Sequence, residues 1–270
     1  MTATRRAALL RKVPPITAIF WVIKLLTTAA GESTSDYLVN HDNPYLVVIV
    51  GFLAFVAALA AQFAVRRYIA SVYWLAVLMV AIFGTMAADV THVVLGVPYI
   101  DSTAAFAVAL AVIFWLWRRT EGTLSIHSIT TRRRELFYWA TVLATFALGT
   151  AGGDLVAYTA HLGFFSAGVV FAVIFAVPAL GYWRAHWPAV PAFWWAYVAT
   201  RPIGASFADW TGKEPNAGGL GIGDGPVVAV LLILIVVAVG YAARQASATP
   251  ATDPRYASRV LADTTEASEQ

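Results

Sequence analysis

The chain has 270 residues, of which 60% are hydrophobic and 12% are charged, and it contains no cysteine. A soluble domain carries about 25% charged and about 45–50% apolar residues, so this composition argues against a soluble protein. The lack of cysteine excludes disulfides, thiolate metal ligands and a cysteine nucleophile. The net charge of +3 does not predict a nucleic-acid partner, because the basic residues follow the loop pattern of a membrane protein.

Eight hydrophobic segments follow one another along the chain, so the lipid bilayer is the expected environment. A helix needs about 20 apolar residues to cross a hydrocarbon core of about 30 Å. The segments lie near residues 16–38, 45–65, 72–96, 103–117, 136–160, 163–183, 192–210 and 226–243. They predict an all-α protein with eight transmembrane helices in one domain over residues 14–245. A basic N-terminal segment (1–13) precedes this domain, and a polar segment (246–270), expected to be a disordered cytoplasmic tail, follows it.

The positions of the Lys and Arg residues predict the orientation. With the N-terminus inside, fifteen of them lie in cytoplasmic segments, Lys213 lies on the other side, and Lys24 and Arg201 lie within spans. Such a positive-inside bias places both termini in the cytoplasm. We therefore expect a multi-pass protein of a bacterial cytoplasmic (inner) membrane. The short connections predict that neighbouring helices pack as antiparallel hairpins.

One pattern occurs four times: an aromatic residue followed by Trp, a Gly ten residues after the Trp and an Asp fifteen residues after it. The copies are Phe20-Trp21, Gly31 and Asp36; Tyr73-Trp74, Gly84 and Asp89; Tyr138-Trp139, Gly149 and Asp154; and Phe193-Trp194, Gly204 and Asp209. Self-similarity of this kind identifies a repeat architecture. The expected unit is a helical hairpin, with repeats near residues 16–65, 72–117, 136–183 and 192–243. Each motif lies on an odd-numbered span, so the four motif helices run parallel and bring equivalent residues to equal depth.

The polar residues of the motif helices share one helical face. Offsets of 3, 7, 11 and 15 residues from the Trp lie on one side of a helix with 3.6 residues per turn. Lys24 stands at offset 3, Thr28 and Arg201 at offset 7, Glu32 at offset 11 and the four Asp residues at offset 15. Four such faces are expected to line a polar cavity, with the two cations near the membrane midplane and the carboxylates in its outer half.

Each element of the motif also has a structural interpretation. The Trp residues suit aromatic-belt anchors at the membrane interface, and the Gly residues suit close helix packing. The Asp residues suit the wet outer boundary of the spans. Lys24 and Arg201 suit structural ion pairs with Glu32 or Asp209, because an unpaired charge inside a membrane is costly.

The carboxylates point to transport of a hard cation. Mg²⁺, Ca²⁺ and Mn²⁺ prefer oxygen ligands, whereas Zn²⁺ and Cu⁺ usually recruit His or Cys. We therefore expect a secondary transporter or exporter of a hard divalent cation, with Mn²⁺ favoured and proton coupling through the same carboxylates. The metal ligands would be Glu32, Asp36, Asp89, Asp154, Asp209 and His92, and the wider site would add Lys24, Arg201 and Thr28. No cofactor is expected apart from the transported ion.

Two alternatives remain open. In the first, Lys24 and Arg201 bind a small anion while the carboxylates carry protons, since the planar fork of Arg suits carboxylate or phosphate. In the second, the protein is a non-transporting membrane scaffold or sensor whose charges form a buried network. An enzyme is not expected, because the chain has no nucleotide fingerprint, P-loop or zinc-protease motif. The sequence is compatible with a homo-oligomer.

Three segments also carry a family resemblance. They are FWVIKLLTTAAGE over residues 20–32, LGTAGGD over residues 148–154 and RPIGASFADW over residues 201–210. Over about residues 14–243 the chain resembles a bacterial family known only as membrane-anchored proteins of unknown function. The resemblance implies a bacterial cytoplasmic membrane and carries over no activity and no catalytic residues.

Overall fold

The computed structural model describes residues 11–248, and within this range the chain is helical with short connections. Eight long helices occupy Ala18–His41 (α2), Pro44–Ala64 (α3), Ala70–Asp89 (α4), Tyr99–Glu121 (α5), Arg132–Asp154 (α6), Gly163–Ala185 (α7), Ala189–Gly212 (α8) and Asp224–Ala248 (α9). Short π-helical turns lie at Val90–Val94 (η1) and Leu155–Thr159 (η3), and 3₁₀ turns lie at Ile126–Ser128 (η2) and Pro215–Ala217 (η4). Residues 11–248 contain no strand, so the all-α prediction is confirmed for this range.

Local sequence signals set several helix ends. The Thr17 hydroxyl accepts a hydrogen bond from the Phe20 N–H at the start of α2. The Asn43 side chain accepts bonds from two backbone N–H groups at the start of α3, whose first residue is Pro44. Such caps satisfy N–H groups that have no partner inside the helix. Gly122 ends α5 in the left-handed conformation that favours glycine.

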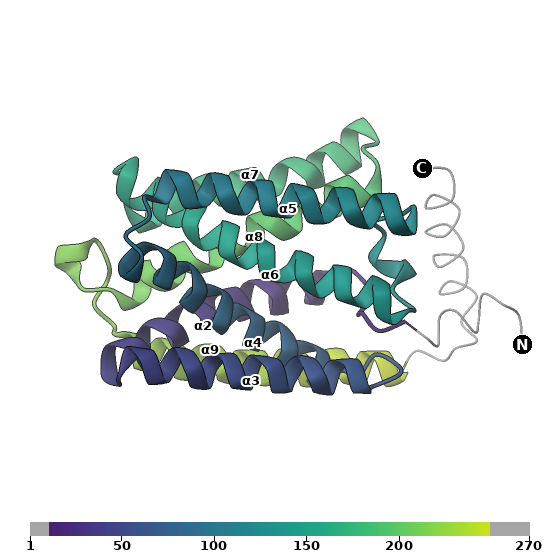
Figure 1. Cartoon of the computed structure of the whole chain (residues 1–270), viewed down its shortest axis with the longest axis horizontal. Coiled ribbons are helices and arrows are strands. Elements are labelled where there is room, and N and C mark those ends of the chain that lie inside the picture. Colours follow the sequence, from purple (N-terminus) through teal and green to yellow (C-terminus); the bar gives the residue numbers. More distant parts are fainter. Residues whose placement is uncertain (1–10, 249–270) are drawn as a thin grey trace, which may run out of the picture.

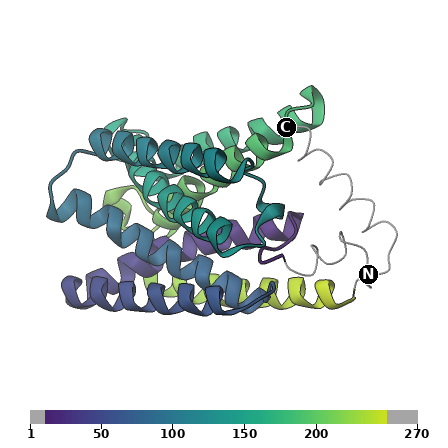
Figure 2. The same cartoon turned by 45° about the vertical axis from the view of Figure 1, so that its right-hand side comes forward.

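The four motif helices, α2, α4, α6 and α8, form an inner ring. α2 packs against α4 and α8, and α6 packs against the same two helices. The other four helices, α3, α5, α7 and α9, lie around this ring (Figure 1, Figure 2). The described chain begins and ends at the same end of the bundle, which we name the terminal end; the opposite end is the far end (Figure 1). All four motif helices run from the terminal end to the far end.

Each outer helix packs mainly against the motif helix of the following repeat. α3 packs on α4, α5 on α6 and α7 on α8, and α9 returns to α2. In contrast, α2 and α3 touch only slightly. The expected hairpin is therefore not the main packing unit, because each outer helix crosses over to the next motif helix after the turn at the far end. Neighbouring repeats are thereby interlocked, and α9 closes the ring.

Apolar side chains cover the outside of the bundle. In α9, 6% of the membrane-length stretch is buried inside the protein, whereas 67% of the stretch that begins with α4 is buried. Within residues 11–248, six helices are long and apolar enough to cross a membrane, namely Pro44–Ala64, Ala70–His92, Tyr99–Glu121, Arg132–Thr159, Gly163–Ala185 and Asp224–Gln245. The chain is therefore a membrane protein, as predicted. α2 and α8 are not among the six, and they carry Lys24, Glu32, Asp36, Arg201 and Asp209.

A buried polar network ties the segment before α2 to the terminal end of the bundle. The Lys12 ammonium donates to the Glu135 carboxylate at 2.5 Å and to the Phe63 carbonyl at 3.3 Å. Gln62 donates to the other carboxylate oxygen of Glu135 at 3.2 Å. Because the Glu135 side chain is buried, this ion pair is shielded from water. The network fixes the start of the described chain to α3 and α6.

Two predicted segments differ in their limits. The spans predicted over residues 72–96 and 136–160 are not continuous α-helices, because α4 and α6 end at Asp89 and Asp154 and continue as the π-helical turns η1 and η3. Residues 246–248 of the predicted tail extend α9, and the rest of that tail lies outside the described residues, as do residues 1–10.

Candidate functional site

Residues at equal distance from the motif Trp form layers across the inner ring, and the first layer is aromatic. We name it the aromatic collar; it consists of Phe20, Trp21, Tyr73, Trp74, Tyr138, Trp139, Phe193 and Trp194. Each Trp packs against the aromatic residue that precedes the Trp of a neighbouring repeat. The ring-centroid distances are 5.6 Å for Phe20–Trp74, 5.7 Å for Tyr73–Trp139, 6.2 Å for Tyr138–Trp194 and 5.6 Å for Phe193–Trp21. These contacts close the ring with pseudo-fourfold symmetry.

The collar is part of the protein core. Trp74, Trp139 and Trp194 are buried, so these three Trp residues are not aromatic-belt anchors. The hydroxyls of Tyr73 and Tyr138 also share a hydrogen bond inside the collar. The repeated Trp is therefore explained by contacts between repeats.

The motif glycines allow the next layer to form. A Cβ at each glycine would overlap with the residue at offset 7 of a neighbouring repeat: Gly31 faces Ala81, Gly84 faces Phe146, Gly149 faces Arg201 and Gly204 faces Thr28. Small residues permit this close approach of helices within a membrane. The packing interpretation of the glycines is confirmed, and one of the four makes room for a buried arginine.

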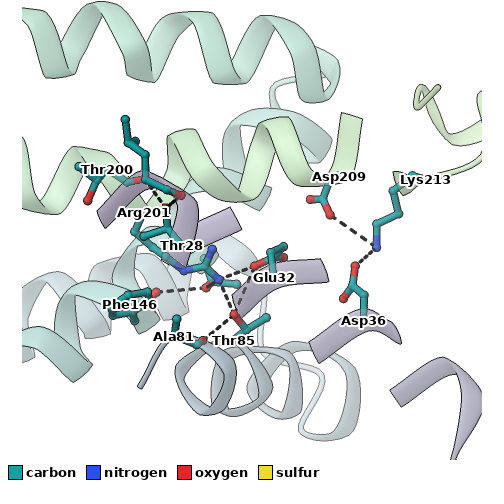
Figure 3. Close-up of polar contacts among 12 residues, drawn as sticks. Thr28, Glu32, Asp36, Ala81, Thr85, Phe146, Thr200, Arg201, Asp209 and Lys213 are labelled. Atoms are coloured by element: carbon teal, nitrogen blue, oxygen red, sulfur yellow. Dashed lines mark hydrogen bonds and ion pairs between the residues drawn. The ribbon is translucent and has the colours of Figure 1, made fainter. Parts of the chain in front are cut away.

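Arg201 occupies the centre of the ring, where its side chain is completely buried. Its Nη2 contacts the Glu32 carboxylate and lies 2.5 Å from Thr85 Oγ1 (Figure 3). The same nitrogen lies 2.7 Å from Thr150 Oγ1. Arg201 lies on α8 and its partners lie on α2, α4 and α6, so all four motif helices meet at one nitrogen atom. The structural ion pair predicted for Arg201 forms with Glu32. At this level the expected polar cavity is filled by side chains in direct contact.

Lys24 lies closer to the terminal end and is also buried. Its ammonium nitrogen lies 4.3 Å from the ring centre of Phe146 and 4.4 Å from that of Tyr197. A cation over an aromatic face gains about 2 kcal/mol when water is excluded. Among residues 11–248, no carboxylate lies within 4.0 Å of this nitrogen. Aromatic faces therefore take the place of the acidic partner expected for Lys24.

Carboxylates gather in the last layer, near the far end, and Lys213 binds two of them. Glu32, Asp36 and Asp209 each offer one oxygen atom, and these atoms lie within 4.8 Å of one another. The Lys213 ammonium forms an ion pair with Asp36 and lies 3.8 Å from Asp209 (Figure 3). Burial lowers the pKa of Lys213, but the Asp209 and Asp36 carboxylates outweigh it and raise that pKa above its usual value. Lys213 is therefore a cation at neutral pH and serves as the counter-ion of these acids.

Asp89 and Asp154 complete this layer in a different way. Both are partly buried, and neither side chain has a hydrogen bond or an ion pair with another residue of the described range. Each is the last residue of its α-helix, and a π-helical turn begins directly after it. Such turns occur frequently at functional sites. With every group ionised, the five carboxylates at offsets 11 and 15 face three cations (Lys24, Arg201 and Lys213), which gives a net charge of −2.

Two predicted site residues bind elsewhere. The Thr28 hydroxyl donates to the Leu25 carbonyl at 2.7 Å and lies 3.3 Å from the Thr200 carbonyl, and within residues 11–248 it has no hydrogen bond to a charged side chain. The His92 ring bonds to the Val97 carbonyl at 3.1 Å and packs on Tyr99 with a centroid distance of 4.1 Å. His92 therefore caps the turn after α4, and it does not belong to the group formed by Glu32 and its two neighbouring Asp residues.

Three residues of the site are not predicted from the sequence. Thr85 and Thr150 stand eleven residues after their Trp, as Glu32 does, and this shared offset is the signal that identifies them. Lys213 is the single Lys or Arg residue outside the spans on the side of the membrane opposite to the termini in the predicted topology. A solitary cation among acidic motifs is the corresponding signal for Lys213.

Comparison with known proteins agrees with the repeat. The family described as "Repeat of Unknown Function (DUF347)" matches the chain four times, at residues 19–68, 72–123, 137–186 and 192–247. Each match holds one motif helix and the outer helix that follows it. No curated protein and no solved structure matches the chain.

Proposed function

The chain belongs to the family built from this repeat of unknown function, and we propose that it is a secondary transporter of a hard divalent cation. In this proposal all eight long helices cross the cytoplasmic membrane of a bacterium, with both termini in the cytoplasm. The basic loops then lie inside, so the far end with its carboxylates faces outward. The acidic site offers oxygen and no sulfur ligands, which suits hard cations, and Mn²⁺ is the cargo we favour among them.

One observation carries the proposal: three carboxylates from two motif helices converge, and two cationic side chains of the protein already balance part of their charge. The oxygens of Glu32, Asp36 and Asp209 lie within 4.8 Å of one another. Arg201 pairs with Glu32, and Lys213 pairs with Asp36. A carboxylate cluster that binds two cationic side chains has the charge and the geometry to bind a free metal cation after these side chains withdraw. Hard divalent cations require such convergent oxygens.

The packed centre of the ring favours a carrier over a channel. Arg201 and Lys24 place two positive charges between the carboxylates and the terminal end, and both are buried. A cation bound by the outer acids meets this barrier on a direct path. Transport therefore requires that Arg201 move or exchange partners, which is typical of a carrier. Proton coupling follows if the carboxylates take up protons when the metal leaves.

Purified protein in liposomes loaded with a Mn²⁺-sensitive dye tests the proposal. Wild-type protein is expected to mediate Mn²⁺ uptake that responds to a pH gradient, and the double variant Asp36→Asn with Asp209→Asn is expected to lose it. Asp101→Asn, which neutralises an exposed acid in the first turn of α5, is the matched control and should transport normally. Equal flux through the wild-type and double-variant proteins would sink the proposal.

A second candidate function is proton-coupled transport of a small anion bound by Lys24 and Arg201. It is favoured by the absence of a carboxylate near Lys24 and by two Arg201 nitrogens, Nε and Nη1, that have no hydrogen-bond partner among the described residues. In the same liposomes this alternative predicts metal-independent uptake of an organic or inorganic anion that Arg201→Lys abolishes.

A further inference from the structure

Three oxygen atoms from three different helices converge on one nitrogen atom at the centre of the ring. Arg201 Nη2 bonds to Glu32 on α2, to Thr85 on α4 at 2.5 Å and to Thr150 on α6 at 2.7 Å. All three partners stand eleven residues after their motif Trp. The fourth repeat has Ala205 at this offset, so three motif helices each contribute one oxygen. We name these three oxygens the cage, and the Arg201 guanidinium reaches it from the fourth motif helix, α8.

The two hydroxyls are oriented as ligands for a cation. Thr85 Oγ1 lies 3.0 Å from the Ala81 carbonyl and 3.3 Å from the Glu32 carboxylate, and Thr150 Oγ1 lies 3.1 Å from the Phe146 carbonyl. Each carbonyl belongs to the preceding turn of the same helix and can accept the hydroxyl hydrogen. The oxygen lone pairs are then directed to the centre of the ring, toward Nη2. Lone pairs that converge in this way are what a metal cation requires.

Arg201 does not use the full donor capacity of its guanidinium. Arginine usually binds a carboxylate through two parallel bonds of its planar fork. Here Nη2, which carries two hydrogens, lies within hydrogen-bonding distance of all three oxygens, while Nε and Nη1 are buried and have no partner among the described residues. The cage therefore fits one small positive centre better than it fits a guanidinium.

We propose that Glu32, Thr85 and Thr150 form a binding site for a monovalent metal cation of the Na⁺ class, which Arg201 occupies in this state. The charge of the three ligands indicates a monovalent ion, because one carboxylate and two neutral hydroxyls balance a single positive charge. A divalent ion would remain uncompensated beside the buried Lys24. Arg201 and the free cation exclude each other, since both need the same three oxygens. The inference rests on the proposed function in one respect: transport requires Arg201 to leave its partners, and the inference names the ion that replaces it. Its test measures binding of that ion and not flux.

The test compares purified wild-type protein with Arg201→Met. Melting temperatures are measured in detergent as choline chloride is replaced by NaCl at constant ionic strength. The wild-type value is expected to be nearly independent of Na⁺, whereas that of Arg201→Met should rise by about 5–10 °C when Na⁺ exceeds its Kd about a hundredfold. A melting temperature of Arg201→Met that does not respond to Na⁺ would overturn the proposal. A temperature rise of equal size in the wild-type protein would also overturn the proposal, because Arg201 would then not occupy the site.

Variants of the hydroxyl ligands provide the control. In the Arg201→Met background, Thr85→Val and Thr150→Val should each remove the Na⁺ effect. Thr145→Val should preserve it, because the Thr145 hydroxyl is equally buried but bonds to the Val142 carbonyl of its own helix and not to Arg201. A Na⁺ effect that survives both ligand substitutions would show that the ion binds elsewhere and would overturn the proposal.

A second measurement covers the possibility that Arg201→Met is too unstable to purify. Binding of radioactive Na⁺ is measured on membranes that contain Arg201→Gln, with wild-type membranes as the reference. Saturable binding in the variant that exceeds the wild-type level at least tenfold supports the site, and equal binding in the two membranes contradicts it. Mn²⁺ transport by the wild-type protein enters neither measurement, so failure of this inference is distinguishable from failure of the proposed function.

Discussion

Arg201 owes its position to a glycine on the neighbouring helix. A Cβ at Gly149 would overlap with the Cβ and Cγ atoms of Arg201 and would also press on Pro202. At Gly152, three residues further along the same helix, a Cβ would meet only the Thr103 methyl group, at 3.9 Å. The two glycines therefore differ in what they permit, although both lie on α6.

Gly149→Ala is expected to lower the free energy of unfolding by about 1–3 kcal/mol, the usual cost of overpacking a core. Displacement of Arg201 from Glu32 should also abolish Mn²⁺ transport. Gly152→Ala should change stability by less than about 1 kcal/mol and preserve transport. Thermal unfolding and liposome flux measure the two effects, and equal behaviour of the two variants would contradict the assigned role of Gly149.

Lys213 competes with a free cation for Asp36 and Asp209. Because its pKa lies above the usual value, its ammonium remains charged on these acids throughout the neutral pH range. Lys213→Met is expected to lower the Kd for Mn²⁺ about tenfold, which corresponds to about 1.4 kcal/mol. Titration calorimetry at pH 7 measures this change. Lys213→Arg keeps the charge and should keep the wild-type Kd; weaker binding by Lys213→Met would show that the lysine is not a competitor.

Individual residues show where prediction from the sequence stops. The shared face of Lys24, Arg201 and Glu32 follows from helical periodicity. The same periodicity gives Glu32 and Asp209 as the two possible partners of Arg201. The choice of partner does not follow, because it depends on how far a long side chain reaches across the ring. The predicted role of Trp74, Trp139 and Trp194 as aromatic-belt anchors is wrong for a similar reason: sequence spacing does not reveal that each Trp faces a neighbouring repeat.

At the scale of helices, the segment before α2 depends on a single buried acid. Glu135 accepts bonds from both Lys12 and Gln62, so its removal leaves the Lys12 ammonium without a counter-charge. Glu135→Ala is expected to reduce the free energy of unfolding by about 3–5 kcal/mol, because an unpaired buried charge is strongly destabilising.

The matched control is Glu121→Ala, which breaks ion pairs with Arg133 and Arg134 at the same end of the bundle. The Glu121 side chain is 6% exposed, but its partners Arg133 and Arg134 are 68% and 26% exposed. Its removal therefore leaves both cations in contact with water, and ion pairs with such exposed partners contribute about 0–1 kcal/mol. Chemical unfolding in detergent compares the two variants. A cost for Glu135→Ala no larger than that for Glu121→Ala would show that the network does not hold the segment.

The helices themselves are the most predictable part of this protein. Eight hydrophobic segments predict eight long helices, because apolar length is a strong signal. Two of these helices end early, at Asp89 and Asp154, and the apolar pattern continues through the π-helical turns without a sequence break. The preference of α3, α5, α7 and α9 for the following motif helix is also invisible in the sequence, since all four are apolar on most sides.

At the scale of the whole molecule, the closed ring predicts tolerance to circular permutation. α9 packs on α2 as α3 packs on α4, and the described chain begins and ends at the same end of the bundle (Figure 1). A permutant can be opened between Arg66 and Arg67, two exposed residues at the terminal end. The first and last segments of the chain are then joined to each other, and we expect this permutant to fold. Its melting temperature is expected to lie within about 5 °C of the wild-type value, since few native contacts are lost.

The control permutant is opened between Asp42 and Asn43, which are equally exposed but lie at the far end. In the proposed orientation its new termini would lie outside the cell and would have to cross the membrane, so it should fail to accumulate. Membrane fractions probed for both proteins decide the outcome. Accumulation of the second permutant together with loss of the first would contradict the ring and its proposed orientation.

The crossing of each outer helix onto the next repeat has a consequence for ancestry. Four separate one-repeat chains could assemble in the same way, each covering its neighbour, as a cyclic homotetramer. Such an assembly would place four copies of every residue around its axis, so one arginine at offset 7 facing one glutamate at offset 11 could not occur in it. A lone arginine opposite one glutamate and two threonines is accessible only after gene fusion has freed the copies to diverge. In this view, covalent linkage of the repeats permitted an asymmetric centre inside a symmetric shell.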